Sequence, residues 1–311
     1  MAFVDENVIK AHLQDTSPEM FENLQAIPPV FANLAEAQRY WELSVRPIMN
    51  FMTLATSWEY VVAESPKETS TRQHIHISDT EWKQIKMVPI SALQEQERRE
   101  PLDIDVPTPL PTMNLHLQRA LDWGTAFEPH FIRSRTPEGR KVFLRATLLQ
   151  IRLKTTLISA TSSPTAGEVQ YDKCTHLFRD IIDLVKSIPD DGPTSQLDRA
   201  SFTFDVGRVG SLYIVATRCR DYKMRREAIS LLLSKPRREC IWDNIVAARV
   251  ATVIMLMEET GLQGGFVPES SRIRVEGLVF DLLEGRGRLR YSRGKWRPPG
   301  ERTIESVEIT W

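Results

Sequence analysis

The sequence predicts an all-α fold, an irregular multi-helix domain that ends in a small antiparallel β-sheet. Two observations carry this prediction. Apolar residues recur every three or four positions through most of 113–259, which is the period of an amphipathic helix. In the tail, 271–311, the period changes to two, as in a half-buried strand. We find no internal repeat of fixed length, and we expect a single domain over residues 1–311.

The first helix is predicted to begin after Asn33. Glu36 follows three residues later, and the two together form a helix N-terminal capping box. The apolar positions behind this cap lie on one helical face: Leu34, Ala37, Trp41 and Val45. Pro47 lacks an amide hydrogen and clashes with the preceding turn, so we expect a kink or a new helix there.

Residues 63–112 differ from the rest of the chain. They are rich in proline, with many Ser, Thr and Glu residues between the prolines. We expect a long loop or lid that contains one short helix, over 79–86 or over 91–99. Loops of this length are uncommon in compact domains and tend to be functional or mobile.

Further helices are predicted over 113–127, 137–157 and 169–188. The second of them has a clear start signal, because Thr136 suits the N-cap and Pro137 suits the first helical position. Its apolar stripe consists of Val142, Ala146, Leu149, Leu153 and Leu157.

The last helices are predicted over 212–217, 223–233 and 243–259. Gly261 follows the final one and would end it as a C-terminal glycine. The tail, 271–311, then folds as a small antiparallel sheet of two or three strands.

Composition and charge exclude several classes of protein. The chain has 311 residues, of which 41% are hydrophobic and 26% charged, as in an ordinary globular protein. The formal net charge of -1 argues against a general polyanion binder. The three cysteines form no C-x-x-C pair and are typical of a reducing compartment. We see no secretory signal and no apolar stretch long enough for a membrane span, so we expect the nucleus or the cytoplasm and no membrane partner.

Motif-like runs occur in a fixed order along the chain. They lie at 27–31 (IPPVF), 34–43 (LAEAQRYWEL), 117–129 (LQRALDWGTAFEP) and 202–243 (FTFDVGRVGSLYIVATRCRD, MRREAISLLLSKPRREC and IWD). Shorter runs follow at 258–259 (EE), 268–269 (PE) and 272–274 (RIR), and the chain closes on 309–311 (ITW). Together these runs resemble the C-terminal regulatory region of fungal six-cysteine zinc-cluster transcription factors, over most of the chain outside the 63–112 segment.

The resemblance implies an all-helical regulatory domain that responds to an effector, dimerises and controls an attached DNA-binding head. In that family the head holds two zinc ions through six closely spaced cysteines. The sequence here has only three cysteines, at Cys174, Cys219 and Cys240. We therefore expect no sequence-specific nucleic-acid binding and no stoichiometric zinc.

Two basic clusters each allow a structural and a functional interpretation. The first spans 218–238 and is interleaved with acidic residues, so we favour ion pairs that hold helices together over phosphate contacts. Trp242, close behind it, is predicted to be structural as well. The second spans 286–297, where basic residues at alternate positions share one face of a strand. This second cluster is interpreted as a solvated sheet face, or else as a surface for phosphate or an acidic partner.

No recognised catalytic or metal-binding motif occurs. His74 and His76 would lie on one side of an extended segment, but no third metal ligand is identifiable, and we predict no metal site. The sequence contains no G-x-S-x-G, Walker loop, dinucleotide-binding glycine fingerprint or H-E-x-x-H. We predict no cofactor, and whether the chain is an enzyme stays open.

The functional hypotheses come from different classes. The first is a non-DNA-binding relative of a fungal transcriptional regulator in secondary metabolism, which binds a small hydrophobic metabolite or a protein partner and forms a homodimer. The second is a cofactor-independent enzyme recruited from this fold, which cyclises, isomerises or joins a hydrophobic natural-product substrate. A third is a truncated gene product with no distinct function.

Any small-molecule site is predicted to lie between the helix that carries Trp123, the 205–211 loop and the 63–112 lid. The loop departs from its family at Arg208 and Gly210, and its N–H groups are placed to meet an anionic or carbonyl ligand. The candidate catalytic residues are His116, Asp122 and His130. The candidate ligand-binding residues are Trp123, Phe127, Asp205, Arg208 and Tyr213. The alternative is that Trp123 is ordinary core and His116 an ordinary surface residue.

Overall fold

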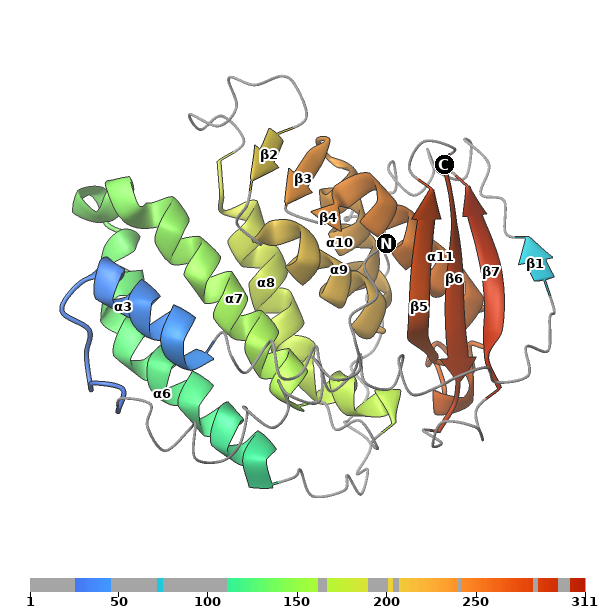
Figure 1. The fold of residues 1–311 in the computed structure, drawn as a ribbon, viewed down its shortest axis with the longest axis horizontal. Coiled ribbons are helices and arrows are strands. Elements are labelled where there is room, and N and C mark those ends of the chain that lie inside the picture. The colour runs from blue at the N-terminus through green and yellow to red at the C-terminus, as the bar shows by residue number, and fades with distance from the viewer. Residues whose placement is uncertain are drawn as a thin grey trace, which may run out of the picture. The chain divides into compact units, whose positions relative to one another are not determined.

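The computed structural model of the 311-residue chain describes residues 26–45, 72–74, 111–161, 167–189, 201–203, 207–239, 242–281, 285–295 and 303–310. These residues are mostly helical and include a small antiparallel sheet near the C-terminus, which confirms the predicted fold class (Figure 1). The chain divides into two compact units, one of residues 1–65 and 107–164, the other of residues 66–106 and 165–311. The prediction of a single domain stays a prediction, and each unit is described by itself.

The first unit is built on two long helices, α6 and α7, with a shorter helical segment packed on α6. Gly124 of α6 makes the close approach of the long helices feasible, since a Cβ there would lie 2.8 Å from a methyl group of Leu153. The elements of this unit are α3 (Leu34–Tyr40), η1 (Trp41–Val45, a π-helical turn), α6 (Pro111–Ser134), η3 (Pro137–Val142, a 3-10 helix) and α7 (Phe143–Thr161).

The N-cap of α3 is Asn33, as predicted, and the capping box is confirmed in part. Asn33 Oδ1 accepts a hydrogen bond of 2.9 Å from the backbone N–H of Glu36, and the Glu36 carboxylate in turn accepts one from the N–H of Ala32. The first bond satisfies an amide that the first helical turn leaves without a partner. The second reaches the residue before the N-cap, not the N-cap N–H that a regular capping box binds. Pro47 lies outside the described residues, so the expected kink stays a prediction.

Two predictions for the first unit need correction. Helix α6 runs through Pro129 to Ser134 rather than ending at Phe127, although proline removes one hydrogen bond of the helical ladder. Val142 is 36% exposed and not part of the buried stripe, because residues 137–142 form a 3-10 turn before α7 begins. The other four members of that stripe are buried, as expected.

The second unit consists of helices α8 to α11 and two small sheets (Figure 1). The predicted 169–188 helix is a 3-10 turn followed by a shorter α-helix. The helical elements of this unit are η4 (Glu168–Cys174), α8 (Thr175–Lys186), α9 (Arg208–Arg218), α10 (Tyr222–Leu233), α11 (Asn244–Glu259) and η5 (Glu269–Ser271). Helix α11 is buried along most of its length and forms the centre of the unit.

The C-terminal sheet has the strand order β1-β7-β6-β5. Strands β5 (Ile273–Asp281), β6 (Arg286–Arg293) and β7 (Glu305–Thr310) pair antiparallel, as predicted, and β1 (Arg72–His74) adds a short parallel strand beside β7. Alternate residues of the sheet join the α11 side chains in one apolar core. This core comprises Val246, Val250, Val253, Ile254, Met257, Ile273, Leu289, Tyr291, Val307 and Ile309.

A second sheet was not predicted. It joins β2 (Ser201–Thr203) in parallel to β3 (Arg237–Glu239), which pairs antiparallel with β4 (Trp242–Asp243). Strands of two or three residues are too short to show a period of two, which explains why the pattern missed them.

Gly261 follows α11 as predicted, but for a different reason. Its φ angle is not among the positive ones of the described glycines. A Cβ at this position would instead lie 2.1 Å from Ser271 Oγ, so the close approach of η5 requires the glycine.

The remaining predictions on local structure lie outside the described residues, among them the short helix over 79–86 or 91–99. Of the 63–112 segment, the structure describes only β1 and the first residues of α6. None of the described helices is both long and apolar enough to cross a membrane.

Candidate functional site

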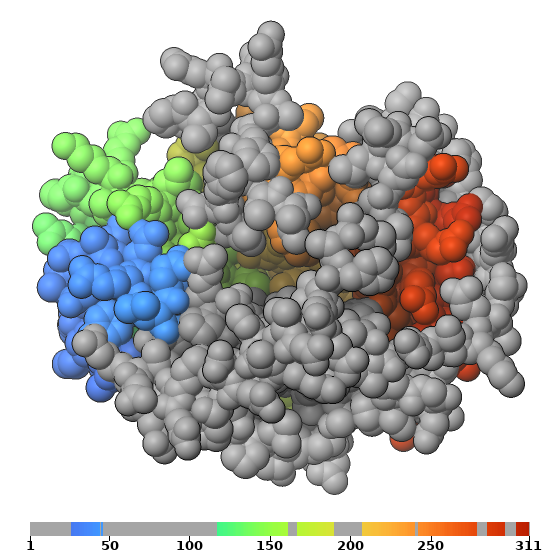
Figure 2. Space-filling model, viewed as in Figure 1, coloured from blue at the N-terminus to red at the C-terminus, as the bar shows by residue number. Residues whose placement is uncertain are grey.

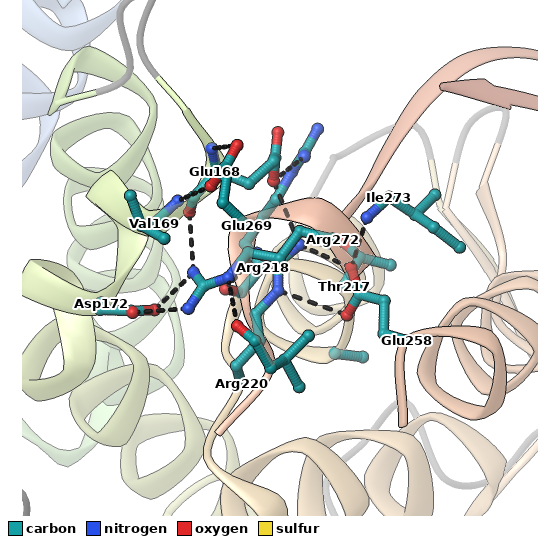
Figure 3. Close-up of polar contacts among 12 residues, drawn as sticks. Glu168, Val169, Asp172, Thr217, Arg218, Arg220, Glu258, Glu269, Arg272 and Ile273 are labelled. Carbon is teal, nitrogen blue, oxygen red and sulfur yellow. Dashed lines mark hydrogen bonds and ion pairs between the residues drawn. The ribbon is translucent and has the colours of Figure 1, made fainter. Parts of the chain in front are cut away.

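The second unit holds a largely buried cluster of arginines and carboxylates, which we call the charge hub (Figure 3). Its members come from η4, the end of α9, the start of α10, the end of α11 and the segment before β5, so the hub lies where five parts of the unit meet. The hub comprises Glu168, Asp172, Arg218, Arg220, Arg225, Glu258, Glu269 and Arg272.

Glu258 is the centre of the hub and is fully buried. Its Oε1 accepts hydrogen bonds from Arg220 Nη2 (2.8 Å) and from the backbone N–H of Ile273 (2.8 Å). Its Oε2 accepts from Arg225 Nη2 (2.6 Å) and from Arg220 Nε (3.3 Å). One carboxylate of α11 thus binds both the α9–α10 connection and the first residue of β5.

Glu168 of η4 extends the hub on the other side of Arg220. Its Oε2 accepts from Arg218 Nη1 (2.5 Å) and Arg220 Nη2 (3.2 Å), and its side chain is only 3% exposed. Arg220 therefore bridges two carboxylates from different elements, while its Nη1 donates to the Arg218 carbonyl (2.8 Å). A planar guanidinium suits such a position because its donors point in fixed directions.

Arg272 and Glu269 attach η4 to the segment before β5. The guanidinium of Arg272, which is fully buried, pairs bidentately with Asp172 at 2.8 and 2.7 Å. The Glu269 carboxylate accepts from the backbone N–H groups of Glu168 and Val169, both at 2.9 Å. These contacts join positions about 100 residues apart in the chain.

Electrostatics keeps every carboxylate of the hub that shows a pKa shift ionised at neutral pH. Burial raises the pKa of Glu258, but the charges of Arg220 and Arg225 more than offset this and bring the pKa to about 2. In Glu168, burial is likewise outweighed, by Arg218 and Arg220, and the pKa is lowered. Glu168 and Glu258 therefore stay ionised at neutral pH and do not serve as proton donors there. The chemistry of the hub is that of a structural cross-link.

Cys219, next to Arg218 and Arg220 of the hub in sequence, is expected to be unreactive. Burial raises the pKa of its thiol to about 12. A thiol that stays protonated is a poor nucleophile and a poor metal ligand.

The basic cluster of the sequence is therefore largely an ion-pair network. Arg238 pairs with Asp243 (3.2 Å), an acidic residue close to the cluster in sequence, as expected. Arg218, Arg220 and Arg225 instead reach Glu168 and Glu258, which lie outside it, and Asp221 caps the start of α10 through the N–H of Met224.

The start of α9 is occupied by the protein's own anion. The carboxylate of Glu239 accepts hydrogen bonds from the backbone N–H groups of Gly207 (3.0 Å) and Val209 (2.9 Å). Glu239 is 2% exposed. These N–H groups belong to the segment that was predicted to bind an anionic or carbonyl ligand, and the Glu239 carboxylate of β3 binds them instead.

Trp242 packs across the same helix. A Cβ on Gly210 would lie 3.4 Å from the Trp242 indole, so the glycine lets the ring lie against the α9 backbone. The Tyr213 ring lies beyond it, with 5.2 Å between ring centroids. The half-buried Trp242 therefore joins β4 to α9, as expected of a structural residue.

In the first unit, Trp123 lies at the centre of an aromatic cluster. Its ring stacks on Phe127 (4.6 Å between centroids) and meets Trp41 edge-on (4.9 Å) and Phe31 at a tilt (5.8 Å). Its indole N–H donates to the carbonyl of Ala37 (3.0 Å). The 27–45 segment thus packs on α6 through the residues of the IPPVF and YWEL runs.

The candidate catalytic residues share helix α6, but only two of their side chains are described. His130 Nε2 lies 2.6 Å from the carbonyl oxygen of Phe31, so this nitrogen carries the proton and donates. Asp122 is exposed and accepts a hydrogen bond from Gln118 (2.8 Å). The side chain of His116 lies outside the described residues.

The candidate ligand-binding residues fall into two groups. Trp123 and Phe127 are fully buried in the first unit. Arg208 and Tyr213 lie on α9 in the second unit, and Asp205 lies outside the described residues. That these groups form one site stays a prediction, as does the absence of metal. His76 and the side chain of His74 are not described, and no group of three metal-ligating residues occurs within the described part of the chain.

Comparison with known proteins gives one informative match. No family model matches the chain, and no solved structure does. Over 87 residues the chain is 37% identical to the aspercryptin biosynthesis cluster-specific transcription regulator of Emericella nidulans. The match covers 27% of this chain and 14% of that regulator. About a quarter of the chain is therefore related to part of a fungal cluster-specific transcription regulator.

Proposed function

We propose that this protein is a non-DNA-binding relative of a fungal transcriptional regulator. The observation that carries the proposal is the 37% identity with part of a cluster-specific transcription regulator. The proposed role is control of secondary-metabolism genes in the nucleus, through a bound hydrophobic metabolite or a protein partner and through a homodimer.

The local chemistry supports a regulatory role over an enzymatic one. In the most motif-like block, 202–243, Asp221 and Glu239 cap helix starts, Arg220 pairs with Glu258 of α11, and Arg238 pairs with Asp243. An enzyme without a cofactor would need acid or base groups directed at a substrate. His130 and Trp123, two residues predicted to lie near such a site, donate instead to backbone carbonyls of the first unit.

The test is deletion of the gene in the organism that encodes it, with transcripts and metabolites measured in parallel. The regulatory proposal predicts changed transcript levels for a group of co-located biosynthetic genes, restored by a wild-type copy. Unchanged transcripts together with loss of one product and accumulation of its precursor would refute it and favour the cyclising or isomerising enzyme. Unchanged transcripts and unchanged metabolites would refute both and favour a product without distinct function.

A further inference from the structure

The outer face of the C-terminal sheet carries a row of arginines along its central strand. Leu289 and Tyr291 of β6 point into the apolar core, so their neighbours at alternate positions point away from it. The arginine face, as we call it, comprises Arg286, Arg288 and Arg290. In the space-filling view, atoms of the C-terminal strands lie at the surface (Figure 2, red).

The three arginines are at least partly accessible. Arg286 and Arg288 are exposed, and Arg288 forms one ion pair with Glu308 of β7, at 3.4 Å, in which the side chains are 46% and 34% exposed. The half-buried Arg290 lies over Gly277 of β5, because a Cβ on this glycine would be 3.9 Å from Arg290 Cβ and Cδ. The Nε of Arg290 is buried and has no hydrogen-bond partner within the described structure.

We propose that the arginine face binds an extended acidic segment of a protein partner. The inference rests on the proposed regulatory function and names the chemistry of its partner. Alternate residues of an extended chain are about 6.6 Å apart, so acidic side chains at every second position of the partner match the spacing of the arginines. Arginine binds carboxylates through paired, charge-assisted hydrogen bonds.

The surroundings of the face favour a peptide over a nucleic acid. Glu308 of β7 lies beside Arg288, with its side chain 34% exposed, and the whole chain has a net charge of -1. A continuous phosphate backbone would be repelled by this carboxylate. A peptide can place its own serines or backbone donors against Glu308 and its acids against the arginines.

The test is fluorescence anisotropy of a labelled short peptide that alternates Asp and Ser, titrated with the full chain at low and physiological salt. Arg288→Ala and Arg290→Ala should each weaken binding about tenfold, a change equivalent to about 1.4 kcal/mol. The matched control is Arg238→Ala. Arg238 has a side chain 47% exposed and pairs with Asp243 at 3.2 Å, yet it lies on β3, outside the arginine face.

The proposal predicts that Arg238→Ala binds the peptide like the wild type, and that duplex DNA of equal charge competes poorly. It is overturned if the peptide does not bind, if all three variants lose affinity equally, or if the DNA binds better than the peptide. Circular dichroism confirms that each variant is folded. These outcomes are independent of the gene-deletion experiment, so a regulator with a different partner surface would fail here and pass there.

Discussion

Replacing Glu258 by glutamine is expected to destabilise the second unit by about 3–5 kcal/mol, the range measured when one partner of a buried ion pair is removed. The substitution keeps the shape of the side chain but removes the charge that faces Arg220 and Arg225. The glutamine NH₂ group would also replace one carboxylate oxygen, and this donor would then face the N–H donors of Arg220 or Arg225 that bind Oε1 and Oε2. The pKa of Glu258 gives an independent value for this loss of stability. A fall from the usual 4.5 to about 2 corresponds to about 3 kcal/mol of preference for the ionised form.

The matched control is Glu259→Gln, one residue further along the same helix. Glu259 pairs bidentately with Arg226, at 2.6 and 2.7 Å, but the two side chains are 16% and 14% exposed. Water can reach this pair, so we expect a loss of about 1 kcal/mol. Urea denaturation followed by far-UV circular dichroism measures both variants. If Glu258→Gln loses no more stability than Glu259→Gln, the hub is not the cross-link described here.

Further perturbations test other parts of the account. Acid should destabilise the protein through Glu258, because its pKa is lower in the folded protein than in the unfolded chain. The contribution of Glu258 to the free energy of unfolding is complete above about pH 4.5 and is lost as the pH falls toward 2. Urea denaturation at a series of pH values measures this loss, which the Glu258→Gln variant should lack. Trp242→Ala should lower stability by about 2–4 kcal/mol and markedly lower the unfolding temperature, since a large ring between β4 and α9 is removed; unchanged stability with loss of function would assign the residue to a binding site. Gly261→Ala should cost about 1–3 kcal/mol through its clash with Ser271, and Ser271→Gly in the same chain should recover most of the loss in urea denaturation. Arg208→Ala and His116→Ala should abolish metabolite binding in calorimetry if the predicted small-molecule site exists; full binding by both folded variants would rule that site out.

The helices of this protein could be predicted because their signals are local. Asn33 and Glu36 mark a helix start within four residues, and the apolar positions of α11 recur every three or four residues from Val246 to Met257. The change of period after residue 271 likewise fixed the C-terminal strands. Each of these features depends only on residues that are close together in the sequence, so the sequence alone is enough to predict it.

The partners of the hub could not be predicted, because they are distant in sequence. Arg220 lies 52 residues from Glu168 and 38 from Glu258, and spacing along the chain does not show which carboxylate it meets. A weak signal did exist for Glu258, Glu269 and Arg272, which lie in segments that resemble the regulator family. Glu168 carried none, since it precedes a helix that looked continuous from residue 169.

The candidate site was predicted least well, for a physical reason. An unpaired N–H group at a helix start looks the same in sequence whether a ligand or a distant carboxylate binds it, and Glu239 is 30 residues or more from the groups it caps. Aromatic residues are ambiguous in the same way, because the same residue types line ligand pockets and fill hydrophobic cores. Trp123 is fully buried among other rings, and its role in a site stays a prediction.

The most direct test of the central claim, that the motif arginines act as an internal cross-link, is a double-mutant cycle between Arg225→Met and Glu258→Gln, measured by urea denaturation. Arg225 Nη2 lies 2.6 Å from Glu258 Oε2, and both side chains are at most 1% exposed. We expect the double variant to be more stable than the sum of the single losses implies, with a coupling energy of about 2–3 kcal/mol, within the range for residues that share one buried network. Additive losses, within about 0.5 kcal/mol, would show that the two residues act independently and would contradict the claim.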